Sequence, residues 1–301
     1  MSCSVTKEAQ ACVSNLPKKT WKDTTWYSVA KQFVRKKTAI VGLCILLFMI
    51  LISVFAPILA PYDYTMIDPI NANQTPNISH LLGTDIYGRD ILSRILYGGR
   101  YSLLMAFTAE LSGVLVGIIL GSVAGYFGGV ADTLILRFCD ILQSIPGMLL
   151  AICISQVMGG GFVPTVIALS FGGISSMVRL LRGQMLNVRK QEFVEAANVI
   201  NCSKFRIMFS HIVPNCLSPL IVTASLGIGG KILTSASLSY LGLGIQEPMP
   251  EWGAMIAMGR QWFRFYPHLI IIPGLFVCIT VLAFNMVGDG LRDALDPKQK
   301  S

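Results

Sequence analysis

Six long apolar segments, each near the length that crosses a lipid bilayer, restrict the fold of this chain more than any other feature. An α-helix rises about 1.5 Å per residue, so about 20 apolar residues match a hydrocarbon core about 30 Å thick. The core holds no water, so the backbone must pair its own N–H and C=O groups, as a helix does. The sequence therefore predicts an all-α membrane protein with six transmembrane helices, at 39–60, 101–126, 134–158, 162–181, 216–240 and 268–287.

The composition and the distribution of basic residues agree with this interpretation. Hydrophobic residues make up 53% of the 301 residues and charged residues only 13%, which is too apolar for an ordinary soluble domain. Of the 24 Lys and Arg residues, 18 fall on the side of the N-terminus, 5 on the other side, and Lys231 lies within the fifth helix. Basic residues accumulate in cytoplasmic segments, so both termini are predicted to be cytoplasmic. The net charge of +8 therefore reflects topology, and we expect no nucleic-acid partner.

The predicted topology divides the chain into five parts. They are a basic cytoplasmic segment (1–38), a first transmembrane helix (39–60), an external loop (61–100), a transmembrane core (101–290) and a cytoplasmic tail (291–301). The core contains a cytoplasmic loop at 182–215 and an external one at 241–267. The eight Cys residues form no CxxC pair, so neither a disulfide framework nor a zinc site is expected.

Glycine and proline mark the helices where close packing or bending is expected. Gly113, Gly117 and Gly121 recur every four residues in the second helix, a spacing that lets a neighbouring helix approach closely. We favour this packing role over a direct role in transport. Pro146 and Pro273 interrupt the third and sixth helices and predict kinks there.

The loop after the fourth helix carries a short amphipathic helical pattern from Glu192 to Ile200. Its acidic residues, Glu192 and Glu195, fall in the first turns, where the helix dipole favours negative charge. Four apolar residues recur at helical spacing and are expected to share one face: Phe193, Ala196, Ala197 and Ile200. The pattern fits a helix that docks against another protein, and it fits equally a helix that lies on the bilayer surface.

The same loop resembles the coupling-loop signature of ABC importer permeases. Glu195-Ala196-Ala197, a turn residue at Asn201 and Pro214 hold the matching positions, and residues 211–215 (HIVPN) are similar to the form found in the dipeptide, oligopeptide and nickel permease family. The family usually has Gly where this chain has Asn201. Asn is the commonest other residue in the left-handed region, so the turn is expected to survive, with Ser203 as the N-cap of the following helix.

Three further segments resemble the same family in the same order. One lies after the first helix, where the GTDxxGRD pattern is formed by Gly83, Thr84, Asp85, Gly88, Arg89 and Asp90. Another lies between the fifth and sixth helices, with SYLGLG at 239–244 and PEWG at 250–253. The last is NMVGDGLRDALDP at 285–297, so the resemblance spans nearly the whole chain.

This resemblance implies the type I ABC importer permease fold and a role as the C-type inner-membrane subunit of a bacterial importer. The implied partners are a second homologous permease, two cytoplasmic ATPases, an external solute-binding protein and membrane lipid. The chain has no G-x-x-x-x-G-K-[ST] motif, so we expect ATP and Mg to be bound by the ATPases, with no catalytic residue, metal ligand or cofactor here. The residues expected to couple to the ATPases are Glu192, Phe193, Glu195, Ala196, Ala197, Ile200, Asn201 and Pro214. Peptides are the expected substrate, and nickel or another small solute such as glutathione is the alternative.

Lys231 departs from the family pattern, in which a small apolar residue is typical at that position. A lysine within a transmembrane helix is costly, about 2.5–3.5 kcal/mol on insertion scales. It either lines the translocation pathway or pairs with a carboxylate, for which Glu110 of the second helix or another subunit is available. We favour the pairing.

Two other classes of membrane protein fit the sequence less well. A self-sufficient secondary transporter would need broken or charged helices in corresponding halves, and no such repeat is present. A membrane enzyme would need converging ionisable groups, but Asp140 and Glu110 stand apart from any recognisable catalytic set.

Overall fold

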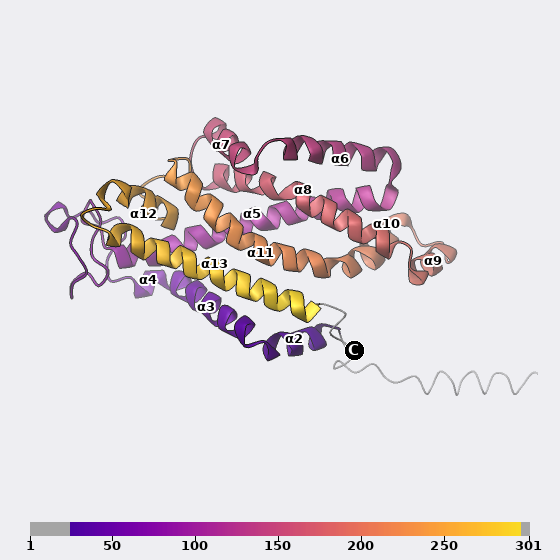
Figure 1. The fold of residues 1–301 in the computed structure, drawn as a ribbon, viewed down its shortest axis with the longest axis horizontal. Coiled ribbons are helices and arrows are strands. Elements are labelled where there is room, and N and C mark those ends of the chain that lie inside the picture. Colours follow the sequence, from indigo (N-terminus) through magenta and orange to yellow (C-terminus); the bar gives the residue numbers. More distant parts are fainter. Residues whose placement is uncertain (1–24, 296–301) are drawn as a thin grey trace, which may run out of the picture.

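The computed structural model describes residues 25–295, which form an elongated bundle of helices (Figure 1). The basic residues before position 25 and the end of the tail, including Pro297, lie outside the described residues. The long helices are α3 (Lys37–Val54), α5 (Ile91–Phe127), α6 (Gly129–Ser144), α7 (Gly147–Met158), α8 (Phe162–Val188), α11 (Val213–Tyr240) and α13 (His268–Leu295). The shorter ones are α2 (Thr25–Arg35), α4 (Ala56–Leu59), α9 (Glu192–Val199), α10 (Lys204–Arg206) and α12 (Trp252–Gly259).

The predicted all-α membrane fold is confirmed, with one difference in the third span. Among the described residues, five helices are long and apolar enough to cross a membrane, and α6 with α7 makes a sixth if the pair counts as one span. This pair is bent by 87°, so the single helix expected at 134–158 is wrong. Pro146 lacks an N–H and pushes the preceding Ile145 into an extended conformation (φ −100°, ψ 128°), which ends α6 outright. Pro273, in contrast, lies inside a continuous α13.

Two helix boundaries also differ from the expectation. Residues 91–100 were expected in the external loop, but they form the first turns of α5. Asp90 caps this helix, because its Oδ2 accepts the backbone N–H of Ser93 at 2.8 Å. The first span, expected to be continuous over 39–60, is divided at Phe55 into α3 and the short α4, which has Pro57 in its first turn.

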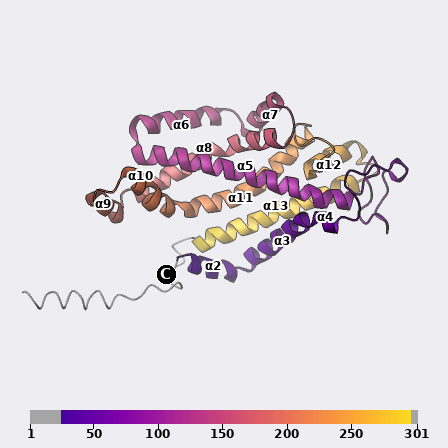
Figure 2. The same cartoon turned by 180° about the vertical axis from the view of Figure 1, so that it is seen from behind.

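Helices α5 and α8 run side by side along much of their length (Figure 2). A Cβ added at Gly117 would lie 2.5 Å from the Cβ of Met177, and one at Gly121 would lie 2.9 Å from the carbonyl oxygen of Val178. Gly125 continues the row, 2.8 Å from the Cβ of Met185 by the same measure. The glycines expected to permit close packing therefore do so, and α8 is the helix that they admit.

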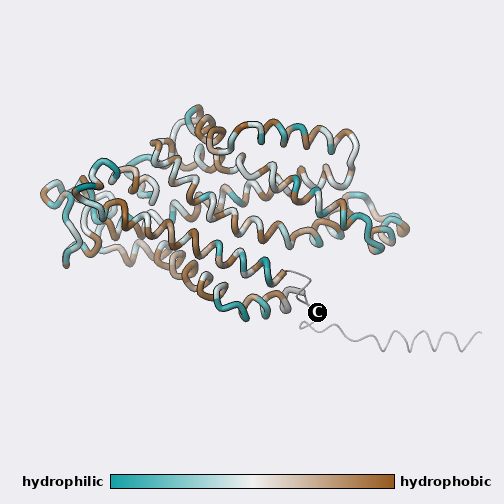
Figure 3. The backbone as a smooth tube through the Cα atoms, viewed as in Figure 1, coloured by the Kyte–Doolittle hydropathy of each residue, from teal (hydrophilic) through white to brown (hydrophobic). Residues whose placement is uncertain are grey.

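The two ends of the bundle differ in what they carry. The loop before α5 and the α12 segment gather at one end, and α9 projects from the other, where α2 and the end of α13 also lie (Figure 1). Hydrophobic residues dominate the helices between these ends, and hydrophilic ones collect at both ends (Figure 3). This is the arrangement that a bilayer around the middle of the bundle requires.

The contact between α5 and α8 can be tested with one matched pair of substitutions. We expect Gly117→Ala to destabilise the protein by about 1–3 kcal/mol, because the new methyl group overlaps Met177. A Cβ added at Gly230 in α11 would have no heavy atom within 4 Å. Gly230→Ala should therefore be neutral or slightly stabilising. Thermal unfolding of the purified protein in detergent measures both, and equal melting temperatures would contradict this packing.

Candidate functional site

The loop that joins α8 to α11 is folded onto the ends of those two helices. Val194 and Ala197 of α9 are buried, at 1% and 6% exposure. They pack in one cluster with residues of α8 and of the segment leading into α11, which includes Leu181, Met185, Ile207, Met208 and Ile212. The inner side of α9 is thus part of the protein core, which fixes its position relative to both neighbouring helices.

The end of α9 has the turn that the sequence predicted. Asn201 adopts the left-handed conformation, with φ of 57°. The N–H of Cys202 donates to the carbonyl of Ala197 at 3.1 Å, and the N–H of Asn201 donates to the carbonyl of Asn198 at 3.0 Å. These two bonds are the Schellman motif, here with Asn in place of the usual Gly.

The chain then enters α11 through an irregular helical segment. Ser203 has the extended backbone of an N-cap, but its hydroxyl makes no cap hydrogen bond, so the expected side-chain cap is wrong. Residues Ile207–Ile212 form a π-helical turn, and Pro214 follows in the first turn of α11. Pro214 has no N–H and its ring clashes with the carbonyl four residues earlier, so a wider turn before it lets the helix continue.

The outer side of α9 is apolar and exposed. Phe193 is 39% exposed and Ile200 is 74% exposed, with the exposed Ala196 between them on the same side. Glu192 and Glu195 are also exposed. The structure therefore corrects the four-residue face expected from helical spacing, because Ala197 faces the core. Sequence reasoning also missed Phe205, which is 66% exposed just beyond the turn.

Polar contacts hold the loop and its helices to α5 and α6. Arg189 at the end of α8 donates through Nη1 to the carbonyl of Tyr126 at 2.9 Å. Two ion pairs join α8 to α6: Arg182 to Asp132, with Nη2 and Oδ2 at 2.6 Å, and Arg179 to Asp140 at 2.7 Å. Asp140, which belongs to no recognisable catalytic set in the sequence, thus forms an ion pair that holds α6 to α8.

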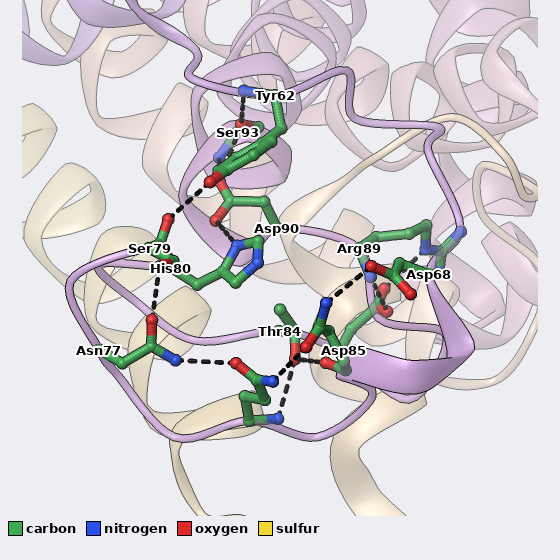
Figure 4. A network of polar contacts seen from close by, with 12 residues as sticks. Tyr62, Asp68, Asn77, Ser79, His80, Thr84, Asp85, Arg89, Asp90 and Ser93 are labelled. Carbon is green, nitrogen blue, oxygen red and sulfur yellow. Dashed lines mark hydrogen bonds and ion pairs between the residues drawn. The ribbon is translucent and has the colours of Figure 1, made fainter.

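The signature residues between positions 83 and 90 form a buried polar network before α5 (Figure 4). Asp85 accepts the backbone N–H groups of Tyr87 at 2.8 Å and Arg89 at 3.0 Å through Oδ1, and the Nε of Arg89 at 2.7 Å through Oδ2. Asp90, besides capping α5, lies 3.0 Å from Nδ1 of His80. The remaining signature residues shape this loop: Thr84 accepts the N–H of Gln74 at 2.8 Å, and Gly83 and Gly88 have φ of 82° and 77°.

Two arginines of this network reach across to the loop after α11. Arg89 and Arg94 are 3% and 0% exposed, and both form ion pairs with Glu247. Burial disfavours the charge on Arg89, but its bonds and charge pairs with Glu247 and Asp85 outweigh that cost and raise its pKa. The network joins two segments that are far apart in the sequence. No local sequence pattern predicts that Glu247 pairs with these arginines.

The intramembrane pair considered from the sequence is not formed. Lys231 donates from Nζ to the carbonyl of Leu169 in α8, and within the described residues it has no ion pair with Glu110. Glu110 is 5% exposed and its carboxylate packs against Gly227, where an added Cβ would lie 2.4 Å from Oε1. Gly227 precedes Lys231 by four residues, so the two charges lie near the same side of α11 about one turn apart.

Comparison with known protein families gives two matches. Residues 113–301 match the model of the binding-protein-dependent transport system inner membrane component. Residues 24–76 match the N-terminal transmembrane domain of oligopeptide transport permease C.

Curated relatives match over almost the full length. The dipeptide transport system permease protein DppC of Alkalihalophilus pseudofirmus is 45% identical, over 92% of this chain and 91% of that protein. The glutathione transport system permease protein GsiD of Pectobacterium atrosepticum is 43% identical over 92% and 93%. The oligopeptide transport system permease protein OppC of Bacillus subtilis is 40% identical over 91% and 90%.

A solved structure has a similar fold. An inward-facing conformation of the MetNI methionine ABC transporter matches with a TM-score of 0.53 and 18% identity. The match covers 66% of this chain and 94% of that chain.

The left-handed turn after α9 makes a prediction about Asn201. Replacing it with Val should destabilise the loop by about 1–2 kcal/mol, because a β-branched residue resists positive φ. Replacing it with Gly should be neutral or slightly stabilising. The rate of limited proteolysis at residues 189–203 reports the local stability. A Val variant that is cleaved no faster than the Gly variant would mean that the turn does not depend on this conformation.

Proposed function

We propose that this chain, which belongs to the family of binding-protein-dependent transport system inner membrane components, carries peptides across the membrane. It is a permease subunit of an ABC importer and a non-catalytic membrane component, as its relatives are. The relatives described above are named for the transport of dipeptides, oligopeptides and glutathione, itself a tripeptide. These names favour peptides over nickel as the substrate.

The chain forms one half of the translocation pathway and works with several partners. Permeases of this family act with an ATPase, a binding protein and a second permease. The assembly that we propose has two cytoplasmic ATPases, which bind ATP and Mg, and an external solute-binding protein. The chain itself lies in the cell membrane of a bacterium, with both termini in the cytoplasm.

The observation that carries the coupling role is the two-sided burial of α9. Val194 and Ala197 fix its inner side to α8 and α11, while Phe193 and Ile200 remain exposed on the outer side. Apolar side chains gathered on a projecting helix are typical of a protein interface. A helix that only lay on the bilayer would lie in the interface plane, level with the ends of the apolar segments, whereas α9 projects beyond the ends of the long helices (Figure 1). Docking of α9 against an ATPase therefore fits better.

Substitutions at two adjacent alanines test this coupling role. Ala196→Trp should leave the permease folded but reduce ATPase co-purification and peptide uptake at least tenfold, because the indole blocks the docking face. Ala197→Trp should instead lower the melting temperature of the permease itself, because it overpacks the core. Ala196→Ser keeps the size and is the matched control. Normal uptake and normal ATPase recovery in Ala196→Trp would rule out α9 as the docking element.

The proposed orientation can be tested by labelling single cysteines in a background without the eight natural ones. Ile78, which is 98% exposed before α5, should react as Cys with an impermeant thiol reagent added to intact cells. Val199, which is 85% exposed at the end of α9, should react only after the membrane is opened. Labelling of the Val199 variant in intact cells would reverse the topology.

A further inference from the structure

A cavity of about 270 Å³ lies between α7, α8 and α11 and has one charged side chain, Lys231, in its lining. Its lining includes Met148 of α7, Leu169 and Gly172 of α8, and Thr234 and Lys231 of α11. A water molecule takes about 30 Å³ in the liquid, so several waters or one end of a peptide fit here.

The ammonium group of Lys231 is held at the wall of this cavity and has hydrogen-bond donors that remain unused. It donates one hydrogen bond to the carbonyl of Leu169. An ammonium group has three N–H donors in total, so two remain. Gly173 makes room for it, since a Cβ at that position would lie 3.2 Å from Nζ. Within the described residues Lys231 has no ion pair, and Glu110 does not line the cavity.

The broken third span independently indicates that this place is shielded from lipid. Gly147 and Met148, the first residues of α7, line the cavity directly after the 87° break at Pro146. Non-helical backbone at membrane depth is tolerated only where it is buried in protein or lines a water-filled cavity. An ammonium group that faced lipid here would also be very costly. The cavity therefore opens to an aqueous route or to a partner subunit.

We propose that this cavity is an anion-binding subsite of the translocation pathway, in which Lys231 receives the C-terminal carboxylate of a peptide in transit. The assignment of the carboxylate rests on the proposed peptide substrate, since a terminal carboxylate is the anionic group that all free peptides share. The hydroxyl of Thr234, on the same wall, can accept or donate a further hydrogen bond to the bound group. The site would favour peptides with a free carboxylate over their amides.

The first arm of the test measures the charge in the cavity. Thr234→Cys is placed in the Cys-free permease within the assembled importer, and its reaction with an anionic and a cationic methanethiosulfonate is timed. We expect the ratio of the anionic to the cationic rate to fall about tenfold when Lys231 is changed to Met, the size expected for one charge at close range. Lys231→Arg should keep the ratio high. A ratio that does not depend on Lys231 would overturn the subsite.

The second arm identifies the ligand by protection of Thr234→Cys. Three pools are used: dipeptides ending in leucine, the same dipeptides as C-terminal amides, and amides with Asp in the first position. We expect only the first pool to slow the reaction, and to do so at least threefold and only with Lys231 or Arg present. Protection by the plain amides would overturn carboxylate recognition, and protection by the Asp amides would overturn the terminal assignment.

Two further outcomes separate this proposal from the proposed substrate class. If the Lys231-dependent rate ratio holds but no peptide pool protects, the anion subsite stands and peptides are rejected as its ligand. If Thr234→Cys is unreactive until the two permeases are separated, Lys231 is covered by the second subunit and the subsite is rejected, whatever the importer carries.

Discussion

The backbone contact between α5 and α8 is the interaction on which the rest of the bundle depends. Gly117 and Gly121 let α8 approach so closely that its register on α5 is fixed within a fraction of a turn. Everything proposed for function is attached to α8. Its last turns supply the core beneath α9, and its middle supplies the Leu169 carbonyl that holds Lys231. A shift of α8 would therefore disturb the α9 loop and the Lys231 cavity together.

The two ends of the bundle differ in which of their residues are buried. At the end that carries α12, the buried Arg89 and Arg94 tie the loop before α5 to the partly exposed Glu247 through ion pairs. Removal of Glu247 would leave two buried arginine charges without one of their partners, which is costly. At the other end, α9 buries one side and leaves the other side apolar and exposed.

The sequence predicted the features that depend on local residues and missed those that depend on distant ones. Apolar length located the spans, and the left-handed tendency of Asn201 located the turn, because each is set within a few residues. The Asp-x-x-Ser cap at Asp90 was also present and would have moved the start of α5. The inward direction of Ala197, the pairing of Glu247 and the partner of Lys231 depend on packing between helices, which spacing within one helix does not specify. The full break at Pro146 depends in the same way on whether neighbours satisfy the freed backbone.

The α9 loop and the Lys231 cavity are both in contact with the same two helices, α8 and α11. At one end, Val194 and Ala197 pack between Met185 of α8 and the segment that enters α11. Further along, the same two helices meet again where Lys231 reaches the Leu169 carbonyl. Because packed cores shift between discrete arrangements rather than deform smoothly, a displacement of α9 would be passed to α8 and α11 as rigid bodies. The packing of α9 and the hydrogen bond from Lys231 to Leu169 therefore both depend on how α8 and α11 lie relative to one another.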